Sequence, residues 1–266
     1  MKMSKEFTIF LAIFTVLMSL NINVNAQVTL PEPVAGKSLT SKIIKNHQVY
    51  PQKALDQKKG GKVVVEFTVG RDGVAKDFRI AKSFDDECAE EALRLVKMIE
   101  WNPATELGKP IEYHTDYTVN FSAKSYLKSE SKNKRVMLPE QAYPAQTSNK
   151  IYETKGLYIQ PQPYFENKQV TLAGYLRAEL QYPELAKQFE IQGTVKLNFV
   201  IETDGRASNI VVENSVGGGC DNEAVRLVQN LLWTPGVKND SLVRTRTSQE
   251  ITFKIGARNY YDGNAY

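Results

Sequence analysis

Histidines and cysteines are the residues of this chain that could carry catalytic or metal chemistry, and they are few. The sequence contains His47 and His114, and no two histidine or cysteine residues stand at the spacing of zinc ligands. A lone histidine is more often a surface or packing residue than a general base. We therefore expect no catalytic residue, no metal site and no cofactor.

Two glycine-containing patterns could be mistaken for functional loops. Gly217-Gly218-Gly219 precedes a predicted helix, but it lacks the Gly-Lys-Ser/Thr ending of a phosphate-binding loop, which favours a plain turn. Asp72-Gly73 and Asp204-Gly205 lie between alternating apolar residues, a pattern typical of hairpin turns. Neither pattern indicates a small-molecule substrate.

Cys88 and Cys220 occupy matching positions in two related halves of the chain. We expect them to be small buried residues on equivalent helices. A bridge between them remains an alternative if the protein is exported.

The chain is organised around a stretch that occurs twice. Tyr50–Pro103 reads again as Tyr182–Pro235 at an offset of 132 residues. A period of this length indicates a duplicated domain. The predicted organisation is a signal peptide (1–26), a first domain (31–123), a polar linker (124–162), a second domain (163–255) and a tail (256–266).

Each copy predicts the same elements in the same order. An amphipathic helix precedes Tyr-Pro, a short helix follows, and a hairpin with period-two alternation turns at Asp-Gly. A second amphipathic helix then ends before Trp-x-Pro, and a last strand closes the copy. In the second copy we place this strand at Ile251–Ile255, reached with two extra residues, with Ile251, Phe253 and Ile255 facing the core.

The first residues have the features of a secretory signal peptide. Lys2 and Lys5 precede an apolar run over 7–20, and Val24-Asn25-Ala26 offers a cleavage site. We expect export to the periplasm with cleavage after Ala26. An uncleaved anchor in the inner membrane, facing the periplasm, is the alternative.

Charge and composition limit the partners. The formal net charge is +4, and there is no basic stripe with interleaved aromatic residues, so nucleic acid is a poor candidate. The segment 124–162 is polar and charged, which predicts a flexible tether.

The ordered set of motifs resembles the C-terminal domain of the TonB family, found twice. The residues that carry the resemblance in the second copy are Gln181-Tyr182-Pro183, Gly193-Thr194-Val195, Asp204-Gly205, Gly219-Cys220-Asp221, Glu223-Ala224, Arg226 and Trp233-Thr234-Pro235. The first copy has Tyr50-Pro51, Gly61, Val63, Asp72-Gly73, Glu91-Ala92, Arg94 and Trp101-Asn102-Pro103.

The resemblance implies an α+β fold with two small domains. Each would have an antiparallel sheet of about three strands and helices packed on one face. It also implies a periplasmic protein that contacts outer-membrane TonB-dependent transporters, whose N-terminal segment adds as a strand beside the last strand. The Pro-rich spacer of a full TonB is missing here, which argues against energy transduction by this chain itself.

A binding module is therefore the first functional hypothesis. The candidate partner-binding residues are Gln181, Tyr182, Pro183, Ile251, Thr252, Phe253, Lys254 and Ile255. The first copy has Val49 in place of Gln181, and we expect it to bind more weakly. The alternatives are an exported scaffold protein whose domains self-associate or bind another envelope protein, and an anchored energy transducer if the leader is retained.

Overall fold

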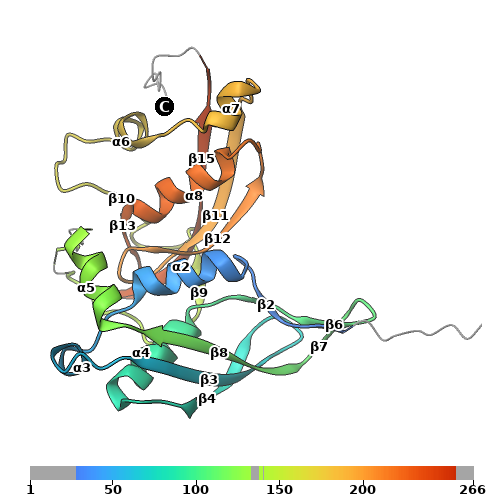
Figure 1. Ribbon diagram of the computed structural model, residues 1–266. Coiled ribbons are helices and arrows are strands. Elements are labelled where there is room, and N and C mark those ends of the chain that lie inside the picture. Colours follow the sequence, from blue (N-terminus) through green and yellow to red (C-terminus); the bar gives the residue numbers. More distant parts are fainter. Residues whose placement is uncertain (1–27, 133–137, 140, 256–266) are drawn as a thin grey trace, which may run out of the picture.

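The structure is a computed structural model that describes residues 28–132, 138–139 and 141–255. The predicted leader (1–26) and tail (256–266) lie outside the described residues. The described chain folds into two similar α+β units, each with an antiparallel sheet and helices on one face, which confirms the predicted fold class (Figure 1). None of the described helices has the length and apolar character needed to cross a membrane.

Three antiparallel strands form the sheet of the first unit, in the order β4-β3-β8. These strands are β3 (Gly61–Val69), β4 (Ala75–Lys82) and β8 (Tyr113–Phe121). Helix α3 (Gln52–Asp56) follows the Tyr-Pro pair, and α4 (Asp86–Lys97) packs against the sheet. Asp85 caps α4 by accepting a hydrogen bond from the backbone N–H of Cys88 at 3.2 Å, as expected for a carboxylate at a helix N-terminus.

The second unit repeats this arrangement and extends it. Its sheet has the order β12-β11-β15-β14, made of β11 (Gly193–Ile201), β12 (Ala207–Asn214), β14 (Gly236–Lys238) and β15 (Ser241–Phe253). The helices are α6 (Leu172–Glu179), α7 (Glu184–Gln188) and α8 (Cys220–Asn230).

Short strands complete both units. In each one, a lead strand pairs with the strand that carries the tryptophan: β2 (Glu32–Pro33) with β5 (Trp101–Asn102), and β10 (Gln162–Tyr164) with β13 (Leu232–Thr234). The first unit also has a small sheet of β1 (Val28–Thr29), β6 (Ala104–Glu106) and β7 (Lys109–Ile111).

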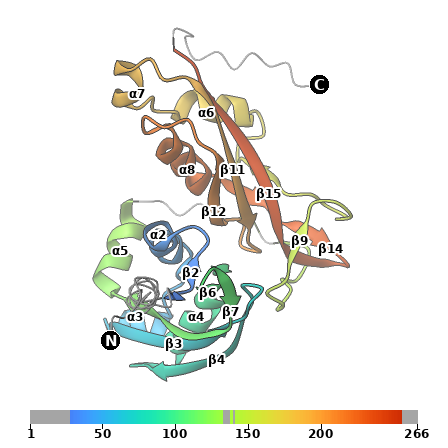
Figure 2. The ribbon, with the colours of Figure 1, turned by 90° about the vertical axis from the view of Figure 1, so that its right-hand side faces the viewer.

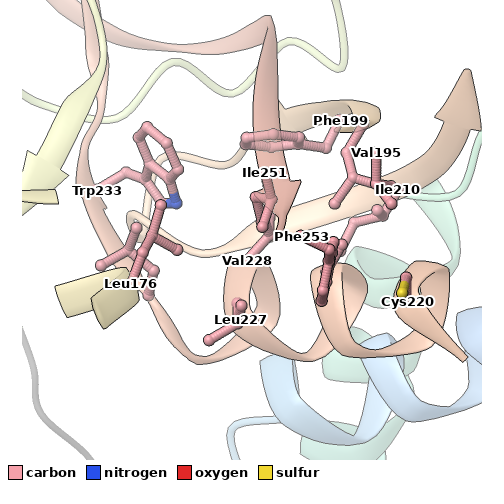
Figure 3. Packing of buried hydrophobic residues seen from close by; sticks show 14 of the residues in the cluster. Leu176, Val195, Phe199, Ile210, Cys220, Leu227, Val228, Trp233, Ile251 and Phe253 are labelled. Atoms are coloured by element: carbon pink, nitrogen blue, oxygen red, sulfur yellow. The ribbon is translucent and has the colours of Figure 1, made fainter. Parts of the chain in front are cut away.

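Two hydrophobic clusters form the cores. Figure 3 shows the second, in which Phe199 and Phe253 from the sheet lie over Leu227 and Val228 from α8. The two tryptophans, Trp101 and Trp233, are buried in their clusters and pack against the sheet residues Phe67 and Phe199. Cys88 and Cys220 are free and buried, so they are not bridged.

Helix α2 (Lys37–His47) belongs to both cores. Ile44 lies in the cluster of the first unit, whereas its neighbour Ile43 lies in the cluster of the second. Both side chains are almost fully buried, at 6% and 4% exposure. Figure 1 shows α2 lying between the two units, below β12 and α8 and above β8. The units are thus in direct apolar contact.

The segment 124–162 is more ordered than its composition predicts. Helix α5 (Ala123–Lys132) follows β8 directly, and β9 (Ile151–Glu153) pairs in parallel with Arg244–Arg246 of β15. Leu242 of β15 exchanges backbone hydrogen bonds with Pro144 and Gln146 at 2.8 and 2.9 Å. This part of the linker is therefore not a free tether.

The predicted end of the last strand in the second unit and its two extra residues are wrong, whereas Ile251 and Phe253 face the core as expected. Phe253 lies opposite Gly193, as Phe121 lies opposite Gly61, so the offset of 132 continues without extra residues. Ile255 follows β15 and is 38% exposed instead of facing the core. The apolar alternation continues to Ile255, but pairing with β11 ends at Phe253, so the pattern alone puts the end of the strand two residues too late.

Candidate functional site

The Tyr-Pro segment of each unit is held against the end of the last strand. The ring of Tyr182 meets the ring of Phe253 edge-on, with centroids 5.7 Å apart, and its hydroxyl donates to the carbonyl of Ile191 at 2.6 Å. Tyr50 and Phe121 repeat this contact in the first unit at 5.6 Å. Burial raises the pKa of Tyr182, so its hydroxyl stays a donor at neutral pH. The contact fixes the Tyr-Pro segment beside the last strand.

A Glu-x-x-Arg pair on α8 also pins this segment through hydrogen bonds to its backbone. In the second unit, Glu223 accepts from the backbone N–H of Gln181 at 2.6 Å, and Arg226 donates to the carbonyl of Glu179 at 2.6 Å. Arg226 also binds both carboxylate oxygens of Glu223, at 2.7 and 2.8 Å. These hydrogen bonds to Glu223 raise the pKa of Arg226, which keeps it fully charged.

The first unit repeats this pin with equivalent atoms. Glu91 accepts from the backbone N–H of Val49 at 2.7 Å, and Arg94 donates to the carbonyl of His47 at 2.9 Å. The sequence identified the Glu and Arg positions as part of a repeated motif, but not their role. The Glu and Arg side chains can hold the Tyr-Pro segment only if their helix lies next to it, and this adjacency is seen only in the fold.

The Asp-Gly turns and the Trp-x-Pro motifs also form one structure. Gly205 has a φ of +77°, and a Cβ there would lie 2.3 Å from the carbonyl oxygen of Trp233. Gly205 in turn accepts a hydrogen bond from the Trp233 backbone N–H at 2.9 Å. A Cβ at Gly73 would likewise lie 2.4 Å from the carbonyl oxygen of Trp101. Glycine is required at both turns because the tryptophan backbone passes directly against them.

The outer edge of β15 is occupied by the linker at one end only. Arg244–Arg246 pair with β9 on the side away from β11, as Figure 2 shows. The ring of Tyr152 in β9 is flanked by the ammonium groups of Lys150 and Lys238, 5.0 and 5.1 Å from its centroid. Within the described residues, Thr247–Phe253 pair with β11, and no second strand pairs with this stretch of β15.

Some of the predicted partner-binding residues lie together at the end of β15, and others do not. Tyr182 and Phe253 are in contact, and Pro183 precedes α7 directly. Gln181 is exposed, as are Thr252 and Lys254, whereas Ile251 faces the core. Ile255 lies beyond the strand, where its backbone N–H donates to the Gln192 side chain at 2.9 Å. The residues brought together are an exposed amide, an aromatic anchor and a strand edge, which can pair with a peptide but offer no catalytic group.

The first unit has a glutamine at its corresponding edge that the sequence comparison missed. Gln48, one residue before Val49, donates to the backbone carbonyl of Asn120 in β8 at 3.2 Å. It lines a groove of about 220 Å³ between α2, the outer side of β8 at Tyr117–Asn120, and α5. Because Gln48 is displaced by one position from the equivalent of Gln181, alignment alone gives no signal for it.

Neither histidine is placed for catalysis. His114 is exposed beside Glu66, with 3.7 Å between the ring nitrogen and the carboxylate. His47 is buried between the two units and contacts Asp204 and the carbonyl of Ala207. Among the described residues, no group of three or more His, Cys, Asp or Glu side chains is arranged to hold a metal ion.

The fold and the site thus define a protein with two tandem α+β domains, each with a Tyr-Pro segment fixed at the end of its last strand. The family described as Gram-negative bacterial TonB protein C-terminal matches residues 46–123 and 178–255. These spans are of equal length and cover more than half of the chain. The chain belongs to this family.

One solved structure illustrates the likeness. The solution structure of the TonB C-terminal domain from Helicobacter pylori is similar at 24% sequence identity, over 32% of this chain and 78% of that chain, with a TM-score of 0.26. A comparison with curated proteins gives no match. Family membership makes this a TonB-like protein of the cell envelope, and domains of the family, which is not enzymatic, interact with outer-membrane proteins.

Proposed function

We propose that this protein binds other proteins in the periplasm, and that its second unit captures an extended N-terminal segment of an outer-membrane TonB-dependent transporter. The segment adds as a strand to the outer edge of β15 along Thr247–Phe253. Gln181, Tyr182 and Pro183 form the neighbouring surface, and Thr252 and Lys254 face the solvent beside it. The protein acts as a binding module linked to transmembrane transport and not as an enzyme.

The observation that supports this most directly is the pairing of β9. A strand from the linker already bonds in parallel to β15 at Arg244–Arg246. The backbone groups on this side of β15 therefore point outward and can accept a strand. An edge with unpaired N–H and C=O groups is the usual target of strand addition. The next stretch of the same edge, Thr247–Phe253, pairs with no second strand among the described residues.

The first unit is expected to bind more weakly, for a reason beyond the absence of a residue like Gln181. The carbonyl of Asn120 on its edge strand already accepts a hydrogen bond from Gln48. A partner strand at β8 would have to replace that bond and fit between α2 and α5. Over Thr247–Phe253 of β15, the only strand pairing within the described residues is with β11.

Export with cleavage after Ala26 is part of the proposal, and it rests on the leader sequence and on the family. The intact mass of the protein purified from the periplasm tests it. A mass that includes Met1–Ala26 would contradict it and favour an anchored energy transducer.

The binding proposal is tested by titrating isotope-labelled residues 27–266 with peptides from the N-terminal segments of transporters. We expect amide shifts along Thr247–Phe253 and at Gln181 and Tyr182. Gln181→Ala should weaken binding several-fold without changing the fold, because the amide side chain can both donate and accept hydrogen bonds. Gln188→Ala, an exposed glutamine on α7, is the matched control.

Two results would contradict the binding proposal. The first is a set of shifts confined to α8, and the second is equal binding at β8 and β15. Concentration-dependent self-association without any peptide shift would favour the scaffold alternative.

A further inference from the structure

We propose that the first unit serves as a built-in cap on the β12 edge of the second unit. In this arrangement the tandem chain is one body, and the second unit presents a single acceptor edge, at β15. The inference concerns the opposite edge of the sheet and does not depend on peptide binding at β15.

Backbone groups of the first unit bind side chains that β12 and β15 present. The carbonyl of Met98 accepts hydrogen bonds from the Asn209 side-chain amide at 2.9 Å and from the Arg244 guanidinium at 2.8 Å. The N–H of Glu100 donates to the carbonyl oxygen of the same Asn209 side chain at 2.9 Å. Asn209 is only 5% exposed, so both of its polar groups are satisfied by the first unit.

Helix α2 extends the contact along β12. Its last residue, His47, is 1% exposed, and its two ring nitrogens lie 3.0 Å from the Asp204 carboxylate and 3.2 Å from the carbonyl oxygen of Ala207. Ile43 on the same helix enters the hydrophobic cluster of the second unit. Apolar contact and hydrogen bonds thus act together over the first half of the strand, where Ala207–Ile210 are all buried.

The second copy differs from the first in the charges along this stretch of the edge strand. Strand β4 carries Lys76, Asp77 and Arg79, which are solvent-accessible at a free sheet edge. The equivalent positions of β12 are Ser208, Asn209 and Val211. Charged side chains are a common means of keeping an edge strand from pairing with other molecules. The first unit carries charged residues on this stretch of its edge, whereas Ser208 and Asn209 of the second unit are uncharged and are covered by the first unit.

A buried ion pair appears at the same place. Glu202 and Arg244 form it at 2.7 Å, with side chains 6% and 8% exposed, and Arg244 is the residue that reaches Met98. The first unit has Gly70 and Glu112 at these positions, so it lacks the pair. A buried pair is costly unless its remaining donors and acceptors are satisfied. Its presence only in the covered unit fits a surface formed to receive the first unit.

The consequence is that undocking exposes the Ala207–Val211 part of the β12 edge, which carries no charged side chain. A second copy of this chain offers the same edge, and two such edges can pair to give a dimer. The full chain with the contact intact should therefore be monomeric, and the released chain should self-associate through β12.

The test uses residues 27–266 with Ile43→Glu, which places a charge in the apolar contact, and separately with Asn209→Asp. The second change keeps the backbone geometry, because Asp77 holds a positive φ of 56° at the equivalent bulge and Asn209 has 47°. It replaces the amide donor to Met98 with a carboxylate. Lys42→Glu, on the exposed face of α2, is the control.

We expect hydrogen exchange at the Ala207–Ile210 amides to rise at least tenfold in both variants. Light scattering should show a concentration-dependent dimer, and the control should stay monomeric. Adding Ser208→Lys and Val211→Arg to Asn209→Asp recreates the charges of β4, and should abolish the dimer while the edge stays exposed.

Two outcomes would overturn the proposal. The first is an Asn209→Asp variant that stays monomeric and whose Ala207–Ile210 amides exchange at the unchanged rate. This variant alone decides the question if Ile43→Glu fails to fold. The other is a dimer that persists when the three β4-like charges are present.

Discussion

Replacing Glu223 by glutamine tests whether the Glu-x-x-Arg pair fixes the Tyr-Pro segment. The change keeps the size of the side chain but removes the charge that accepts the Gln181 N–H at 2.6 Å and two bonds from Arg226. A hydrogen bond to a charged group contributes about 1.5–3 kcal/mol, against about 0.5–1.5 kcal/mol for a neutral one. We therefore expect a local loss of about 1–2 kcal/mol.

Hydrogen exchange at the Gln181 amide measures this loss directly. Since 1.4 kcal/mol corresponds to a tenfold change in an equilibrium constant, exchange should become roughly 5- to 30-fold faster. The Val49 amide is the internal control, because it makes the same contact with Glu91 at 2.7 Å in the first unit and should not change. The reciprocal variant, Glu91→Gln, should reverse the pattern.

The peptide-binding site should respond as well. If Gln181 and Tyr182 belong to the docking surface, a looser segment must be ordered again on binding, which lowers affinity. Exchange at Gln181 that changes less than twofold would refute the pinning argument. Equal acceleration at Val49 would instead mean that the substitution destabilises the whole chain.

Three further predictions follow from single contacts. Gly205→Ala should destabilise the second unit clearly more than Gly217→Ala in thermal unfolding, since both have positive φ but only the first would meet the Trp233 carbonyl. Cys88 and Cys220 should resist alkylation at pH 8 until the chain unfolds, because both are buried and burial raises the pKa of Cys88 to about 12; labelling of the native protein would contradict this. Acid should loosen the contact between the units through Asp204. Burial acts to raise the pKa of Asp204, but the facing His47 and the hydrogen bond from the Arg206 N–H outweigh burial, so the pKa is lowered. A carboxyl group with a lowered pKa stabilises the fold above its unfolded pKa of about 3.9, and this contribution is lost as the pH falls further. Its side chain is 40% exposed, so the effect should be modest, and exchange at Ala207 between pH 5 and pH 2 measures it.

Much of each unit could be predicted from the sequence because the signals are local. The alternation in Val63–Val69 and the Asp-Gly turn predict the hairpin, and both depend only on neighbouring residues. The apolar stripe of α4 and its acidic N-terminus likewise predict a helix with one buried face. The repeat itself then transfers every such prediction from one copy to the other.

The candidate site could be predicted only in part. Family resemblance proposed Tyr182 and Phe253 as candidate partner-binding residues, and the fold brings their rings into contact. It assigned Ile255 to the strand, because an alternating apolar pattern does not mark where pairing stops. It also missed Gln48, whose contact with Asn120 joins residues 72 positions apart in the chain.

The sequence by itself determined the duplication, the elements of each unit and the turns between them. The tertiary structure alone decided what those elements pack against. Periodicity indicates that Ile43 and Ile44 are buried, but it cannot say that they enter different cores. Periodicity also gives no sign that the linker residues Ile151–Glu153 pair with β15, because backbone hydrogen bonds need no particular side chain. Long-range contacts depend on how all the elements pack together, and in this protein they join the two units into one body.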